Sequence, residues 1–146
     1  MSGSKTVAAA GGLMALLLSA GAASAAEACK LGTEYQVTSV AAYKRPVETG
    51  GYGGTVTPVL RGAEIRVAAQ PGLTAEWMER KLEAQVATGE CTFGVTRANV
   101  DVVSEGDNFI VRVTNREEIG ALNRPTAADE RAAAEILSRA SELPPR

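Results

Sequence analysis

The sequence predicts an α+β protein, a two-layer sandwich in which two helices cover one face of a largely antiparallel sheet. Several short segments alternate between apolar and polar residues, which is typical of strands with one buried face. Two other segments each carry one apolar stripe at helical spacing, and such helices must bury the stripe against another layer. These segments follow the order β-(β)-β-α-β-β-α in what we interpret as a single domain, residues 26–146.

Strand-forming residues dominate the first half of this domain. Residues 35–43 are rich in Val, Thr and Tyr and predict a strand that gives way at residues 44–46. The glycine run Gly50 to Gly54 predicts a flexible loop or wide turn. Residues 55–60 predict a further strand, at an edge or bulge because the segment contains a proline, and residues 62–69 predict a cleaner one.

The first helix is expected after Pro71 and Gly72 break that strand. Thr74 is the candidate N-cap, and Gly89 has the position of a left-handed residue that ends a helix. Trp77 lies at the edge of the apolar stripe, where its ring can be buried while its N–H contacts water. The stripe itself is expected to contain Ala75, Met78, Leu82 and Val86.

A hairpin and a second helix complete the predicted order. Residues 98–103 and 109–114 predict antiparallel strands around a loop at 104–108, and residues 117–123 predict a short irregular turn. Thr126 and Asp129 have the spacing of a capping box and start a helix. That helix is expected to bury Ala133, Ile136, Leu137, Ala140 and Leu143, to form the ion pairs Arg131–Glu135 and Glu135–Arg139, and to end at Pro144-Pro145.

Residues 1–25 predict a cleavable secretory signal peptide of the bacterial type. Lys5 supplies a positive start, Val7 to Leu18 carry no charge, and Ala23-Ser24-Ala25 matches the pattern that signal peptidase accepts, with cleavage after Ala25. The apolar stretch is shorter than the roughly 20 residues that a membrane span needs. We therefore expect an exported protein, periplasmic or secreted, without a stable membrane anchor; an uncleaved anchor and acylation of Cys29 are the alternatives.

Cys29 and Cys91 are the two cysteines of the chain, and export would place them where disulfides persist. We expect them to pair and to tie the start of the mature chain to the region after the first helix. Their spacing is not that of a redox Cys-x-x-Cys pair, and the chain has no histidine to complete a metal site. The net charge of −2, without a basic run, gives no electrostatic reason to bind nucleic acid or anionic lipid.

The sequence contains no recognisable catalytic or cofactor-binding set, so we expect no catalytic residue, no cofactor and no metal. The absence of histidine excludes Ser-His-Asp and Cys-His nucleophiles, and no phosphate-binding loop motif occurs. Three features stay open as ligand sites. They are the glycine run with Tyr52 as a lid, the hairpin end with Asp101, Glu105, Asp107 and Asn108 as calcium ligands, and an aromatic face of Tyr35, Tyr43, Tyr52 and Trp77.

The run Arg61-Gly62-Ala63-Glu64-Ile65-Arg66-Val67, followed by Pro71-Gly72-Leu73-Thr74-Ala75-Glu76-Trp77, resembles small exported bacterial proteins of unassigned function. That resemblance implies a His or Cys after the helix; only Cys91 lies there, so we carry over no metal site. The element order is also similar to BON-like and KH-like units of envelope proteins, which implies a layout and no function.

We therefore predict a non-enzymatic binding or accessory domain of the cell envelope. Its partner is expected to be an envelope protein or a small ligand. The alternatives are a histidine-free hydrolase that works through two carboxylates, and a protein that binds a small ligand or metal.

Overall fold

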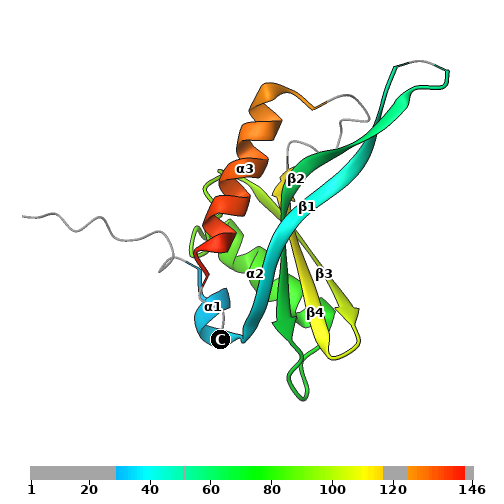
Figure 1. Ribbon diagram of the computed structural model, residues 1–146. Helices are drawn as coiled ribbons and strands as arrows, with labels where there is room; N and C mark the ends of the chain where they lie inside the picture. Colours follow the sequence, from blue (N-terminus) through cyan, green and yellow to red (C-terminus); the bar gives the residue numbers. More distant parts are fainter. Residues whose placement is uncertain (1–28, 51, 117–124, 144–146) are drawn as a thin grey trace, which may run out of the picture.

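The computed structural model describes residues 29–50, 52–116 and 125–143, which form one antiparallel sheet of four strands with helices packed on it (Figure 1). The strand order is β1-β2-β4-β3, so β1 and β3 are the edge strands. The predicted α+β class and the antiparallel sheet are thus confirmed. In chain order the elements are α1 Leu31–Glu34, β1 Val37–Thr49, β2 Thr55–Ala68, α2 Ala75–Ala87, β3 Ala98–Glu105, β4 Asn108–Asn115 and α3 Ala127–Ser141.

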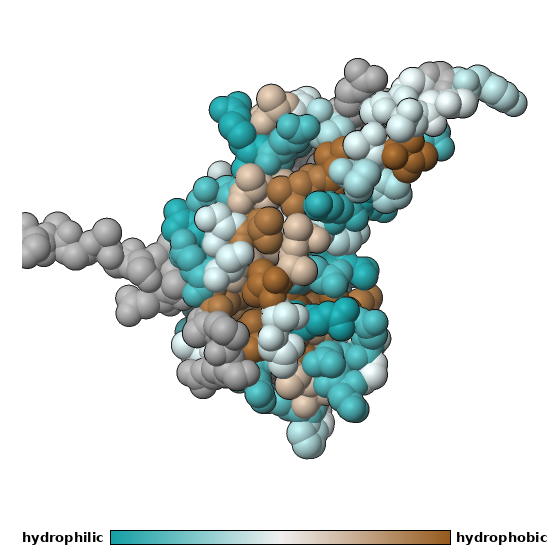
Figure 2. Space-filling model, viewed as in Figure 1, coloured by the Kyte–Doolittle hydropathy of each residue, from teal (hydrophilic) through white to brown (hydrophobic). Residues whose placement is uncertain are grey.

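The core lies between one face of the sheet and the helices α2 and α3. In β2 from Ala63 to Val67, in β3 from Ala98 to Val102 and in β4 from Phe109 to Val113, every second residue points to this side and is buried. Figure 2 shows apolar atoms along the seam between α3 and the β1–β2 pair. Burial of each large apolar side chain contributes about 1.5–3 kcal/mol, so this layer supplies most of the stability. Its largest fully buried members are Leu31, Val37, Ile65, Val67, Met78, Leu82, Val111, Val113 and Ile136.

Both predicted helix starts are confirmed. Thr74 is the N-cap of α2, and its hydroxyl accepts a hydrogen bond from the Trp77 N–H at 3.3 Å. Thr126 and Asp129 form the expected capping box at α3, with the Thr126 N–H donating to Asp129 Oδ2 at 2.7 Å. Gly89, just past the end of α2, has a φ of 75° and provides the left-handed turn.

The disulfide joins Cys29 to Cys91, with 4.0 Å between the two Cα atoms. Both cysteines are buried members of the core cluster. The bond holds the segment before α1 against the segment that follows α2, as the sequence predicts.

Three predicted strand boundaries were wrong. β1 starts two residues later than expected, because Tyr35 ends the short helix α1, and it continues through residues 44–46 to Thr49. β2 runs unbroken from Thr55 to Ala68, so the two predicted segments are one strand. The reason is continuous pairing between β1 and β2, which supplies backbone partners that local propensity does not anticipate.

The loop of the second hairpin is also shorter than predicted. Glu105 pairs with Asn108, which leaves Gly106 and Asp107 as the whole connection. Two-residue loops are the commonest hairpin connections because their twist matches that of the strands.

One of the two predicted ion pairs on α3 is wrong. Glu135 Oε1 accepts from Arg139 Nε at 2.8 Å, whereas Arg131 Nε donates to the carbonyl of Ala127 at 3.2 Å. A carboxylate that precedes its cation by four residues has the better orientation, and Glu135 therefore selects Arg139.

The predicted signal peptide, the turn at 117–123 and Pro144-Pro145 lie outside the described residues. Within the described ranges, no helix has both the length and the apolar character to cross a membrane.

Candidate functional site

The described glycines of the run, Gly50, Gly53 and Gly54, lie at the tip of a long two-stranded arm, which we define as residues 44–50 and 52–60. β4 pairs with β2 only as far as Gly62, whereas β1 and β2 remain paired out to Thr49 and Thr55. The two strands therefore project beyond the rest of the sheet (Figure 1). Tyr52 at the tip is fully exposed and covers none of the residues that the structure describes, so the structure does not place it as a lid.

Two prolines face each other in the middle of the arm, because Pro46 of β1 lies directly opposite Pro58 of β2. Proline has no N–H, so this must be a non-hydrogen-bonded pair, in which backbone groups point to the outer edges. Each outer edge of the arm thus lacks a donor at its centre. Such an edge resists the addition of a further strand, and the arm offers its side chains for contact instead.

Asp101 and Glu105 of the second hairpin belong to an ion-pair ladder on the sheet face opposite the helices, whereas Asp107 lies in the hairpin loop. Asp101 Oδ2 lies 3.8 Å from Arg112 Nη1, and Glu64 Oε2 lies 3.3 Å from Arg112 Nε. Glu105 Oε2 lies 3.4 Å from Arg66 Nη2. In the described part of the chain no group of three or more acidic or cysteine side chains could hold a metal ion. These carboxylates are paired with arginines, and they do not converge as calcium ligands would.

The predicted aromatic face is not formed as one surface. Tyr43 stacks under Arg112 on the ladder face, with 5.5 Å between guanidinium carbon and ring centroid, and Tyr52 is at the arm tip. Tyr35 and Trp77 do come together on the other side of the molecule. Their ring centroids lie 5.5 Å and 5.1 Å from Lys81 Nζ.

Tyr35, Trp77 and Lys81 line a shallow groove of about 470 Å³ beside the loop between β2 and α2. Lys81 donates to the Glu34 carboxylate, and this hydrogen bond raises the pKa of Lys81, which keeps the ammonium charged. Tyr35 is buried, whereas Trp77 is 51% exposed. The ammonium is therefore already occupied by an acid and two rings of the same chain, and the groove has no charge left to offer a ligand.

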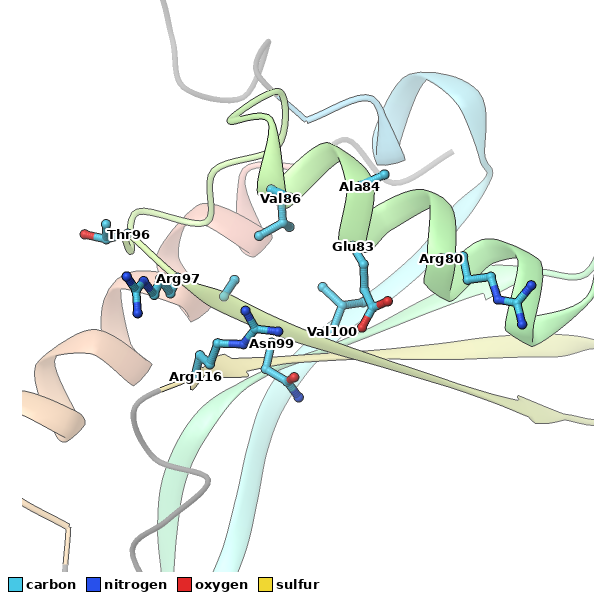
Figure 3. A pocket seen from close by; sticks show the side chains of 11 residues that line it. Arg80, Glu83, Ala84, Val86, Thr96, Arg97, Asn99, Val100 and Arg116 are labelled. Atoms are coloured by element: carbon cyan, nitrogen blue, oxygen red, sulfur yellow. The ribbon is translucent and has the colours of Figure 1, made fainter.

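A larger cavity of about 570 Å³ lies between α2 and the edge strand β3 (Figure 3). Arg97 and Arg116 lie at one end of it. The backbone N–H of Arg116 donates to the backbone carbonyl of Arg97 at 2.9 Å, which holds the two residues side by side. Glu83 points from α2 toward the sheet, whereas the guanidinium of Arg80 points away from the other labelled side chains (Figure 3). Among the described residues, Glu83 is the one carboxylate that lines this cavity, so these residues form no pair of catalytic carboxylates there.

None of the three arginines around this cavity has a carboxylate within ion-pair distance in the described ranges. Arg66, Arg112 and Arg139 do form ion pairs with carboxylates. Sequence reasoning missed this cluster because Arg80, Arg97 and Arg116 come from three separate segments and form no basic run. Their spacing along the chain carries no signal that could have found them.

Comparison of the chain with protein-family models, with curated proteins and with solved structures finds no match. The resemblance of residues 61–77 to small exported proteins, and the similarity in layout to BON-like and KH-like units, therefore stay predictions.

Proposed function

We propose that this chain is an exported, non-enzymatic binding domain of the cell envelope, which contacts an envelope protein through its arm. The signal-peptide pattern of residues 1–25 supports export. The Cys29–Cys91 disulfide is compatible with an oxidising compartment. The observation that carries a binding role is the arm itself.

The arm adds little to the stability of the body. None of its described side chains is buried, and a two-stranded hairpin without a covering layer is marginally stable in water. On the arm, Tyr52 is fully exposed and Val56 is about half exposed. Both side chains have apolar surface, whose contact with water is unfavourable. Figure 2 includes an apolar patch among the polar and pale atoms of the arm. A partner that covers the arm would bury this surface at about 25 cal/mol per Å².

The chemistry of the contact follows from the two opposed prolines. Because Pro46 and Pro58 block strand addition at both edges, the partner is expected to contact the faces and tip of the arm. Lys44, Arg45 and Glu48 supply charges for orientation, and Tyr52 supplies an amphipathic ring of the kind enriched in interfaces. We therefore expect a protein surface with an aromatic-lined hollow as the partner.

A photocrosslinking residue placed at Tyr52 in living cells tests this proposal. The expected result is one discrete crosslinked product in the envelope fraction. The matched control carries the same residue at Glu130, which is exposed on α3. Its product should be absent, because α3 lies on the body of the domain.

Mass spectrometry of the same sample tests the export that the proposal requires. We expect a mature chain that begins at Ala26. The proposal would be contradicted by equal crosslinking from both positions or by no crosslinking from position 52. A cytosolic chain that retains Met1 would also contradict it.

A further inference from the structure

The outer edge of β3 already binds one carboxylate. Glu79 Oε2, from α2, accepts a hydrogen bond from the backbone N–H of Val102 at 2.9 Å. Since β3 is an edge strand, no neighbouring strand competes for this donor. The contact demonstrates, within the same chain, that this edge and α2 lie at the right separation for a carboxylate between them.

The same edge offers two further donors beside Val102. The backbone N–H of Arg116 donates to the backbone carbonyl of Arg97, where the β3–β4 pairing begins. These two residues are therefore a hydrogen-bonded pair. Directly opposite residues alternate between bonded and non-bonded pairs, and the register continues without a shift through β3. The N–H groups of Ala98, Val100 and Val102 therefore all point away from β4, and the Glu79 contact agrees with this direction.

Ala98 and Val100 line the cavity between α2 and β3, next to Arg97 and Arg116. Among the described residues, no side chain accepts a hydrogen bond from the N–H of either Ala98 or Val100. The two guanidinium groups have no carboxylate partner in the same part of the chain. The cavity therefore brings together two backbone donors and two cations whose forked N–H groups match carboxylate oxygens.

We propose that this cavity binds a small ligand that carries two carboxylates. One carboxylate accepts from an edge N–H group, that of Ala98 or of Val100, as Glu79 does from Val102. The second carboxylate pairs with Arg97 and Arg116. The cavity volume of about 570 Å³ is in the range of sites for small molecules.

Glu83 is the feature of the cavity that opposes an anion. Its carboxylate faces the sheet from the α2 wall (Figure 3), so it repels a dianion and sets the affinity below what the arginines alone would give. Removal of the Glu83 charge is therefore expected to raise the affinity for the dicarboxylate, whereas removal of the arginine charges is expected to lower it. The proposal does not depend on the arm, which lies elsewhere in the fold, and each can fail without the other.

Calorimetric titration of the mature, oxidised protein with succinate at low ionic strength tests the site. We expect saturable binding that Arg97→Gln with Arg116→Gln weakens at least tenfold and that Glu83→Gln tightens several-fold. The matched control is Lys44→Gln with Arg45→Gln, which removes the same charge from the arm and should leave the affinity unchanged. In amide NMR spectra, succinate should shift the signals of Ala98 and Val100.

Acetate and inorganic phosphate separate the ligand classes in the same experiment. Both should bind at least tenfold more weakly than succinate, because each offers one anionic group where succinate offers two. The proposal would be overturned if succinate did not bind, or if phosphate bound as tightly as succinate. It would also be overturned if the arm control lost as much succinate affinity as the arginine variant, or if Glu83→Gln bound succinate more weakly than the native chain. A folding defect cannot imitate the expected result, since Glu83→Gln must increase the affinity.

Discussion

The ammonium group of Lys81 in α2 binds the carboxylate of Glu34 in α1, which precedes it by 47 residues. The same ammonium lies within 5.5 Å of the rings of Tyr35 and Trp77. Together with the neighbouring disulfide, this contact attaches the short first helix to the domain.

Replacement of Lys81 by Met should lower the free energy of unfolding by about 1 kcal/mol, because it removes an ion pair and two cation–π contacts at a partly exposed site. The pKa of Lys81 is raised in the folded state, mainly by Glu34. The stabilisation is therefore complete below the ordinary lysine pKa of 10.5 and is lost as pH rises through the raised value. Melting curves from pH 9 to pH 12 should show this loss in the native chain and not in Lys81→Met.

Replacement of Cys91 by Ser should lower the free energy of unfolding of the oxidised protein by about 2–4 kcal/mol. The bond joins residues 62 positions apart, so its loss restores much freedom to the unfolded chain. Cys29→Ser should have the same effect, and the double variant should be no less stable than either single one. Titration of the denatured native protein should find no free thiol; two free thiols would contradict the pairing.

Asp129→Ala should destabilise the protein by about 1 kcal/mol through loss of the α3 capping box. The Thr126 backbone N–H and hydroxyl lower the pKa of Asp129 in the folded state. Its contribution is thus present above the ordinary pKa of 3.8 and is lost as pH falls through the lowered value. Chemical denaturation at pH 7 and pH 2 measures the difference, with Glu130→Gln, another acid of the same first turn, as a control that should change little.

Gly62→Ala should be far more damaging than the sequence suggests. A Cβ atom at Gly62 would lie 1.9 Å from the Val113 carbonyl oxygen of the neighbouring strand, so β2 and β4 would have to separate. We expect a loss of more than about 2 kcal/mol, as for other changes that force overpacking.

Gly72→Ala is the matched control for Gly62. Gly72 also has positive φ, at 81°, but its position has no heavy atom within 4 Å of an added Cβ. Only backbone strain of about 1 kcal/mol is expected there. Equal destabilisation of the two variants would show that the close approach of β4 is not the cause.

Local chemistry made much of the fold predictable from the sequence. The N-caps Thr74 and Thr126 and the helical stripes depend on residues close in sequence. The cysteine pairing follows from the presence of two cysteines in the chain. Each of these predictions was confirmed. The length of β1 and β2 was not predictable in the same way. Lys44-Arg45-Pro46 is a poor strand by propensity, and only the facing strand makes it extended.

By itself, the sequence determined the fold class, the helix starts and the disulfide, because caps and amphipathic periodicity act over a few residues. Only the tertiary structure decided which polar groups meet. It placed Asp101 against Arg112 and Glu105 against Arg66, which made two acids of an apparent acidic cluster members of an ion-pair ladder. It also brought Arg97 and Arg116 beside the open edge of β3, since a sheet joins residues by register and not by their distance along the chain.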